Sequence, residues 1–307
     1  MGSEMCIRDR NLTGFWEGLD RYRRRVEELK KETLKGRVML VLLAASWGGT
    51  FPAMKVAVLD LDVFFFLLLR FCVALAAFIP LLALTHKRIP PDPRGLGLGV
   101  VVFLGFLFQV FGLKYTTAIN SAFITSLNTP LVPILGFLIF HRKPGLKSVL
   151  GIAIGMLGLT LLTGAYEMKS LSIGDLLTFI CAFLWALQIL LVDKVAKKVD
   201  ALELAYSEAI SVFALSTIFS LSVGEVWKTP GGDAAIAVVY TGAVATAFAF
   251  YAQAWAQRWV PPEVAGLILL LEPVFASIFA FLILGETLDL IEALGAALIL
   301  LGVGISE

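Results

Sequence analysis

The sequence has little charge for its length. Charged residues make up 16% of the 307 positions, whereas 59% are hydrophobic and the mean hydropathy is +0.88. Soluble domains carry about 25% charged residues. We therefore expect lipid, rather than water, to surround most of this chain.

Histidine and cysteine are both scarce. The two histidines, His86 and His141, stand in basic stretches between apolar ones, which excludes a histidine proton relay inside a membrane. The three cysteines, Cys6, Cys72 and Cys181, lie far apart, so they predict neither a disulfide framework nor a metal site.

The sequence motifs of enzymes are also missing. The chain has no glycine-rich phosphate loop, no dinucleotide fingerprint, no motif of a nucleophile with its base, and no metal-ligand spacing. We therefore expect a protein that is not an enzyme, that needs no cofactor or metal ion, and that has no nucleic-acid partner.

What the sequence does contain is a series of long apolar runs. A hydrocarbon core of ~30 Å needs about 20 residues of α-helix, and ten segments meet or approach that length. Short connections with turn signals separate them. The predicted fold is an all-α integral membrane protein with ten transmembrane helices, at about residues 38–58, 62–84, 96–114, 117–140, 147–165, 174–192, 203–224, 234–257, 262–284 and 289–305.

Lysine and arginine are distributed unevenly between the two sides of this predicted bundle. With the amino terminus in the cytoplasm, 20 of the 25 basic residues fall on the inner side and 4 on the outer side, while Arg70 lies within a span. The positive-inside rule therefore predicts a multi-pass protein of the cell (inner) membrane with both termini in the cytoplasm.

The segment before the first span is basic. Residues 1–11 show no pattern and look like a scar rather than native sequence. From Leu12 to Leu29, apolar residues recur at steps of three and four, and arginine or lysine fills much of the rest. Residues 1–35 are thus predicted to form an amphipathic leader on an anionic membrane surface, with a solvated helix as the alternative.

The two halves of the chain resemble each other. Four residues of the first half match four of the second at a constant offset of 138, namely Gly36 and Gly174, Ala44 and Ala182, Trp47 and Trp185, and Asp62 and Asp200. Each half holds five spans, so the second half starts on the opposite side of the membrane. This pattern predicts inverted repeats at 36–166 and 174–306, with a substrate site between them near the bilayer midplane.

Two motifs in these repeats resemble those of a known family. They are Ser46-Trp47-Gly48-Gly49-Thr50-Phe51 in the first half, and in the second Leu271-Glu272-Pro273-Val274-Phe275-Ala276 followed by Leu284-Gly285-Glu286. Residues 36–306 are similar to the EamA branch of the drug/metabolite transporter superfamily. The resemblance implies small-molecule transport through a cavity built from both repeats. The first half departs from the pattern, with His141-Arg142-Lys143-Pro144 where the second has Gly285-Glu286.

Three charged residues stand inside apolar spans. Glu272 lies within the apolar stretch 264–284 and is followed directly by Pro273. A carboxylate at this depth costs ~2.5–3.5 kcal/mol on insertion scales, so it favours a place facing a partner or water. We interpret Glu272 as a ligand for a substrate amine or as a proton carrier. Arg70 and Glu208 occupy equivalent positions of the repeats, where a structural ion pair or snorkelling is an equal alternative.

Hydroxyls, amides and tryptophans share one face of several spans in both halves. Such groups often only bond a neighbouring helix, but their number favours a common cavity. The predicted substrate-binding residues are Glu272, Arg70, Trp47, Thr50, Ser121, Thr125, Asn128, Trp185, Gln188, Thr246 and Gln253. Glycines at 151, 155 and 158 in one span, and at 295 and 302 in another, predict close helix packing within or between protomers.

The function predicted from these observations is secondary transport, directed outward, of small polar or amphipathic metabolites such as amino acids, by alternating access. A carrier of sugar phosphates or nucleotide sugars is the alternative within transport, and a passive channel or an integral-membrane enzyme is the alternative outside it. Proton coupling, exchange and facilitated diffusion stay open. The expected partners are a small-molecule substrate, membrane lipid and a second copy of the chain in a homodimer.

Overall fold

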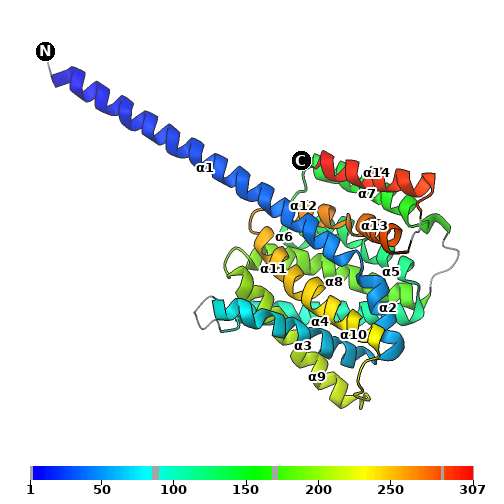
Figure 1. The fold of residues 1–307 in the computed structure, drawn as a ribbon. Helices are drawn as coiled ribbons and strands as arrows, with labels where there is room; N and C mark the ends of the chain where they lie inside the picture. Colours follow the sequence, from blue (N-terminus) through cyan, green and yellow to red (C-terminus); the bar gives the residue numbers. More distant parts are fainter. Residues whose placement is uncertain (1–2, 85–89, 168–171, 285–286, 307) are drawn as a thin grey trace.

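The computed structural model of the chain describes residues 3–84, 90–167, 172–284 and 287–306, and side chains from residue 21 onward within these ranges except those of 167, 283 and 284. Throughout the described residues the regular structure is helical (Figure 1). The first half holds α1 (Ser3–Trp47), α2 (Thr50–Asp60), α3 (Val63–Leu84), α4 (Pro93–Tyr115), α5 (Ala118–Thr125), α6 (Asn128–Phe140) and α7 (Leu146–Leu162).

The second half is also helical. A short 3₁₀ turn, η1 (Ala165–Glu167), lies between the halves. It is followed by α8 (Ile173–Val195), α9 (Ala201–Ser222), α10 (Gly232–Val239), the π-helix η2 (Tyr240–Phe248), α11 (Ala249–Ala256), α12 (Pro262–Leu269), α13 (Glu272–Leu284) and α14 (Leu290–Ile305).

The chain is a multi-pass membrane protein. Within the described residues, eight helical stretches are long and apolar enough to cross a bilayer. Two further apolar helices, α7 and α14, have 17 and 16 residues. They coincide with the fifth and tenth predicted spans and are shorter than the other eight stretches.

Three of the predicted spans contain a break that the sequence pattern did not predict. The first is interrupted at Gly48 and Gly49, the fourth between α5 and α6, and the ninth between α12 and α13. Pro130 and Pro273 stand in the first turns of α6 and α13. Proline lacks a backbone N–H, but in the first turn of a helix this group would have no hydrogen-bond acceptor within the helix. The prolines thus permit a new helix to start at mid-span.

The break at Gly48 and Gly49 has a packing reason. A Cβ atom on Gly48 would lie 2.9 Å from the backbone nitrogen of Ala276, and one on Gly49 would lie 2.9 Å from the Tyr240 hydroxyl. Only residues without a side chain therefore allow α13 and η2 to approach the first span this closely.

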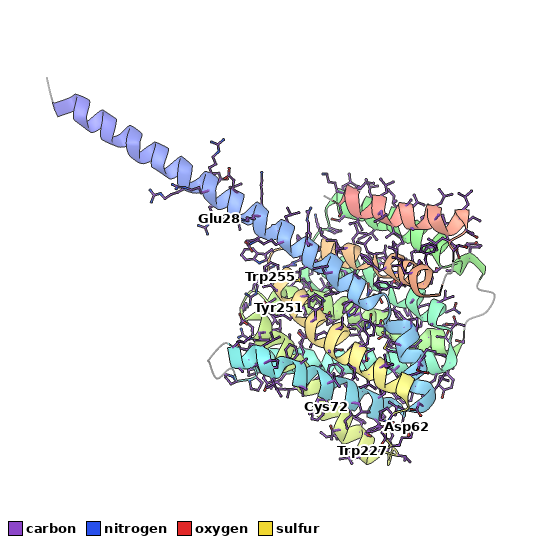
Figure 2. The ribbon with its side chains drawn as sticks, viewed as in Figure 1. Glu28, Asp62, Cys72, Trp227, Tyr251 and Trp255 are labelled. Carbon is purple, nitrogen blue, oxygen red and sulfur yellow. The ribbon has the colours of Figure 1, made fainter. Side chains whose placement is uncertain are left out.

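The leader is continuous with the first span. The sequence predicted a separate segment ending at residue 35, but α1 runs unbroken from Ser3 to Trp47, a stretch that contains no proline. It leaves the bundle as a straight helix (Figure 1) beside the turn between α11 and α12, where Gly36 lies close to Ala256 and Val260, and Glu28 stands well clear of the other helices (Figure 2). Contact of this helix with a lipid surface stays a prediction.

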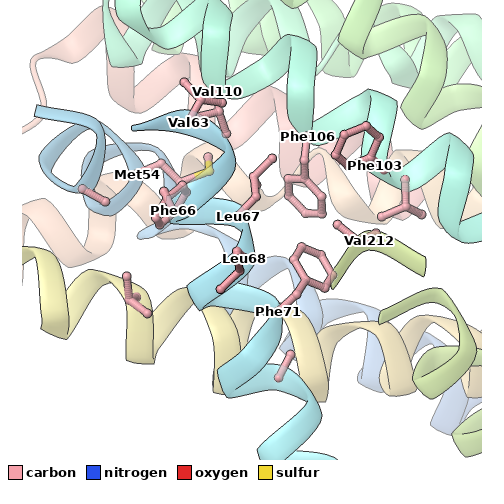
Figure 3. Close-up of a cluster of buried hydrophobic side chains, with 14 of the residues drawn as sticks. Met54, Val63, Phe66, Leu67, Leu68, Phe71, Phe103, Phe106, Val110 and Val212 are labelled. Atoms are coloured by element: carbon pink, nitrogen blue, oxygen red, sulfur yellow. The ribbon is translucent and has the colours of Figure 1, made fainter. Parts of the chain in front are cut away.

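The helices of the two halves pack against each other. Helix α4 of the first half packs against α8 of the second, and the stretch α10–η2–α11 of the second half packs against α1 and α2 of the first. Helix α3 contacts α9, and α7 contacts α14. Aromatic and aliphatic side chains of α2, α3, α4 and α9 fill the space between the halves (Figure 3), including Phe71 and Phe106, whose ring centroids are 5.5 Å apart.

The glycines predicted to mark close packing form one seam within the chain. A Cβ atom on Gly151 would lie 2.5 Å from the carbonyl oxygen of Gly302, and one on Gly158 would lie 2.6 Å from that of Gly295. The prediction of a packing seam is confirmed, because α7 and α14 approach each other backbone to backbone along these residues.

Candidate functional site

A narrow cavity of about 40 Å³ lies between the two halves. A single water needs roughly 10–15 Å³ on this measure, so the cavity has room for a few waters in this conformation. Residues of both halves line it, namely Trp47, Thr50, Met54, Arg70, Phe106, Gln109, Thr125 and Asn128 from the first, and Trp185, Gln188, Ile189 and Glu272 from the second.

The helix breaks bring polar groups to this cavity. Trp47 and Thr50 stand on either side of the α1–α2 break, and Thr125 and Asn128 on either side of the α5–α6 break. Glu272 is the first residue of α13. Interrupted helices at the bilayer midplane occur where backbone lines a cavity rather than lipid. The breaks therefore mark the same place as the polar residues.

Arg70 is a buried cation in the cavity wall. Its side chain is 1% exposed. The guanidinium donates from Nε to the Thr246 hydroxyl at 2.8 Å, and its carbon lies 4.2 Å from the centroid of the Phe106 ring. Among the described residues no carboxylate lies within ion-pair distance of Arg70. The positive charge is thus held in place but not neutralised.

The π-helix η2 supplies the acceptors that hold Arg70. The carbonyl of Ala245 accepts a hydrogen bond from Trp47 Nε1 at 3.0 Å and a longer one from Arg70 at 3.4 Å. The Thr246 hydroxyl in turn donates to the Thr241 carbonyl five residues earlier, at 2.8 Å. A π-helical turn is rare and is found at functional sites. Here it connects cavity residues of the first half to the second half.

Glu272 presents a carboxylate at the amino end of α13. This position is electrostatically favourable for an anion, because the helix dipole is positive there. The side chain is half-buried, and within the described part of the chain it has neither a hydrogen bond nor an ion pair. Trp47 and Trp185, whose ring centroids are 6.4 Å apart, line the same cavity.

An amide pair forms another part of the wall. Gln188 on α8 and Gln253 on α11 exchange two hydrogen bonds of 3.1 and 3.0 Å. Gln188 lines the cavity, whereas Gln253 is 2% exposed and lies behind it. The pair fixes the orientation of the amide that faces the cavity. Glu208, which is also buried, faces the Gln188 amide from α9.

The structure brings most of the predicted substrate-binding residues together. Eight of the eleven line the cavity, namely Glu272, Arg70, Trp47, Thr50, Thr125, Asn128, Trp185 and Gln188. Thr246 and Gln253 lie behind the wall and hold Arg70 and Gln188. Ser121 is fully buried and does not line the cavity. The Gly285-Glu286 motif lies outside the described residues.

Sequence reasoning missed four lining residues. Gln109 carried a usable signal, because it is a lone amide in an apolar span and is 5% exposed. Met54, Phe106 and Ile189 carried none, since apolar residues of these types fill every span. Phe106 nevertheless matters, because its ring lies against the Arg70 guanidinium.

Comparisons with known proteins agree with this fold. An uncharacterized transporter of Archaeoglobus fulgidus is 32% identical over 264 residues, which cover 86% of this chain and 83% of the relative. The uncharacterized transporter YoaV of Bacillus subtilis is 21% identical over 281 residues, 87% of this chain and 95% of the relative. A protein of known crystal structure has the same fold, with a TM-score of 0.75 over 90% of this chain and 98% of its own, at 19% identity.

A family model covers most of the chain. The EamA-like transporter family matches residues 34–164 and again residues 172–306. Together with the relative above 30% identity, these two matches identify the chain as a member of the EamA-like transporter family.

Proposed function

We propose that this protein is a secondary transporter that exports small zwitterionic metabolites, with amino acids as the leading class. The observation that carries the proposal is the pair of opposite charges in one cavity. Arg70 and Glu272 both line it, and no ion pair joins them. Two buried opposite charges that do not neutralise each other favour a ligand that carries both signs.

A zwitterion suits the chemistry of the two ends. The Arg70 guanidinium can donate to a substrate carboxylate, and such charge-assisted hydrogen bonds are among the stronger ones in proteins. Glu272 can accept from a substrate ammonium, with the faces of Trp47 and Trp185 available for cation–π contact. The small cavity fits a substrate with a short backbone between its two charged groups. A larger substrate would require a conformation in which the cavity is wider.

Transport by alternating access rests on the proposed inverted repeat. The matching helix pairs, α4 with α8 and α10–η2–α11 with α1 and α2, support it. In this arrangement α7 and α14 are the fifth and tenth helices of the repeats, and both termini are cytoplasmic in the cell membrane. The halves would then rock against each other around the cavity.

The rival substrate class would need a different cavity. Sugar phosphates and nucleotide sugars carry two or more negative charges, and their recognition uses several cations. Of the residues that line this cavity, Arg70 is the one with a cationic side chain. This observation favours the zwitterion over the phosphate ester.

The test is counterflow with the purified protein in liposomes. Vesicles loaded with one unlabelled amino acid at a time should accumulate the same labelled amino acid for at least one member of the series. Sugar phosphates should give no accumulation. Counterflow with a sugar phosphate but with none of the amino acids would overturn the proposed substrate class.

A further inference from the structure

A second pocket lies at one end of the helix bundle, apart from the central cavity. It has a volume of about 360 Å³ and is formed where α6 ends, where α8 ends and where α11 turns into α12. Four basic side chains line it, from Arg142, Lys143, Lys197 and Arg258, together with the carboxylates of Asp193 and Glu263. These six side chains carry a formal charge of +2.

Part of the basic cluster is held in a fixed arrangement. Asp193 is 1% exposed and accepts hydrogen bonds from Arg142 at 2.7 Å and from Lys197 at 2.6 Å. One carboxylate therefore holds two cations, from the first and the second half of the chain, side by side at the wall of the pocket. Because one negative charge neutralises only one of them, the group keeps a net positive charge.

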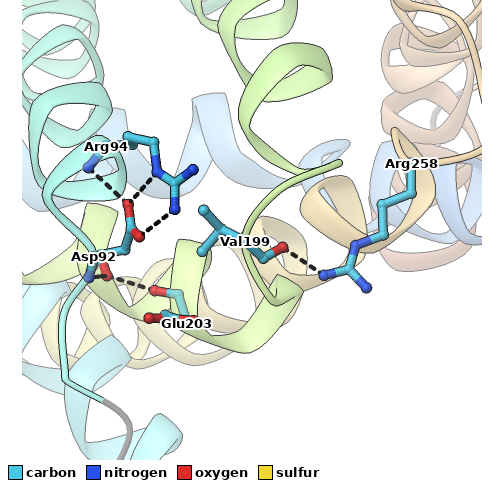
Figure 4. A network of polar contacts seen from close by, with 6 residues as sticks. Asp92, Arg94, Val199, Glu203 and Arg258 are labelled. Atoms are coloured by element: carbon cyan, nitrogen blue, oxygen red, sulfur yellow. Dashed lines mark hydrogen bonds and ion pairs between the residues drawn. The ribbon is translucent and has the colours of Figure 1, made fainter.

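The remaining two cations have donors to spare. One terminal nitrogen of Arg258 donates to the Val199 carbonyl at 2.6 Å (Figure 4) and lies 3.7 Å from the Asp200 carboxylate. Its Nε is buried without a hydrogen-bond partner in the described part of the chain. Lys143 is exposed, and no ion pair of the described residues involves it. An anion in the pocket would meet the uncompensated charge of Lys143 and the guanidinium of Arg258, whose contact with the exposed Asp200 is long and therefore weak.

The surroundings of the pocket are those of a lipid headgroup. It opens at the ends of four membrane-spanning stretches, which is the depth of the phosphates in a bilayer. Trp259 lines it and is 37% exposed, and partly exposed tryptophans are enriched at this interface. In the last turn of α6, next to the pocket residues Arg142 and Lys143 in the chain, the apolar side chains of Phe137, Leu138 and Ile139 are exposed.

We propose that this pocket binds one anionic phospholipid, with the phosphodiester between Lys143 and Arg258 and the acyl chains along the end of α6. The positive charge of the pocket favours an anionic lipid over a zwitterionic one. The exposed apolar side chains at the end of α6 favour a lipid over free phosphate. The inference is independent of the transported substrate, because the central cavity takes no part in it.

The test is a titration of the full-length protein in detergent with phosphatidylglycerol, followed by native mass spectrometry to count bound lipids. Lys143→Gln should weaken the tightest site by roughly five-fold, as expected for one charge near a phosphate. The matched control is Lys114→Gln, an exposed lysine at the end of α4 with no ion pair among the described residues, which should leave binding unchanged. Arg258→Gln, if it folds, should weaken the site as well.

Two further arms identify the ligand. Phosphatidylcholine should not occupy the site at the concentration at which phosphatidylglycerol saturates it, and inorganic phosphate should not displace the bound lipid. Equal binding of phosphatidylglycerol by the wild type and Lys143→Gln would overturn the proposal. Displacement by phosphate alone, or equal occupancy by phosphatidylcholine, would overturn it too.

Discussion

Arg70 shows how a charge can be kept inside a membrane protein. Burial of a cation without compensation is costly, but here the Thr246 hydroxyl, the Ala245 carbonyl and the face of Phe106 replace water. None of these groups is charged, so the positive charge of the arginine is not neutralised and is available for the proposed substrate. The arrangement also relies on the planar, forked shape of the guanidinium.

Replacing Arg70 by lysine should therefore destabilise the protein although the charge is kept. A lysine ammonium cannot reach Thr246 and Ala245 in the same geometry, and loss of one hydrogen bond to a charged group costs about 1.5–3 kcal/mol. The unfolding temperature in detergent should fall for Arg70→Lys. It should stay unchanged for Arg94→Lys, because Arg94 pairs with Asp92 at the surface. Equal stability of both variants would contradict this account of Arg70.

The sequence identified the charged and polar residues of the cavity more readily than the apolar ones. A carboxylate such as Glu272 or an amide such as Gln188 is conspicuous in an apolar span, and both line the cavity. Thr246 and Gln253 were predicted to contact substrate but instead bind Arg70 and Gln188. The reason is that a polar face of a helix identifies the side that faces other helices, without separating the wall of the cavity from the layer behind it.

At the scale of elements, the π-helix η2 is the part that sequence periodicity could not predict. Nothing in residues 240–248 distinguishes a π-helix from an α-helix, because the extra width comes from contacts with other elements. Arg70 and Trp47 bond to Ala245, and a Cβ atom on Gly242 would lie 2.5 Å from the Arg70 carbonyl. The sequence similarity of the two halves likewise did not predict the helix breaks in three of the spans.

The Thr246 hydroxyl should stabilise η2, because it accepts from Arg70 and donates to Thr241. Thr246→Val keeps the shape and removes both hydrogen bonds. We expect faster backbone amide hydrogen exchange at residues 240–248 in this variant. Thr217→Val is the control, since its hydroxyl bonds only the Phe213 carbonyl of its own helix. Unchanged exchange in η2 for Thr246→Val would show that the hydroxyl does not hold the π-helix.

The seam between α7 and α14 can be tested with two glycines of one helix. A Cβ atom on Gly302 would lie 2.5 Å from the Gly151 carbonyl, whereas one on Gly304 meets nothing within 4 Å. Gly302→Ala should destabilise the protein by about 1–3 kcal/mol through overpacking. Gly304→Ala should be neutral or stabilise it by about 0.5–1 kcal/mol through helix propensity. Thermal unfolding of both variants in one detergent checks the difference, and similar values would contradict the seam.

At the scale of the whole molecule, the distribution of basic residues and the positions of the helix ends define a proposed orientation. Thr229, between α9 and α10, should lie outside, and Lys198, after α8, should lie inside. Both residues are exposed. In a background without the native cysteines, Thr229→Cys should react with an impermeant thiol reagent added to intact cells, and Lys198→Cys should react only after permeabilisation. The reverse pattern would overturn the orientation.

The central claim, that Glu272 in the cavity binds the transported zwitterion, is tested most directly by uptake into liposomes. Glu272→Gln keeps the shape of the side chain but removes the charge. Because Glu272 has no ion-pair partner among the described residues, the unfolding temperature should stay the same or rise. Counterflow of the amino acid that the wild type transports should fall about tenfold or more, as for a lost charge-assisted hydrogen bond.

Glu28→Gln, on the projecting part of α1, should transport like the wild type. A stable Glu272→Gln variant with normal uptake would contradict the account.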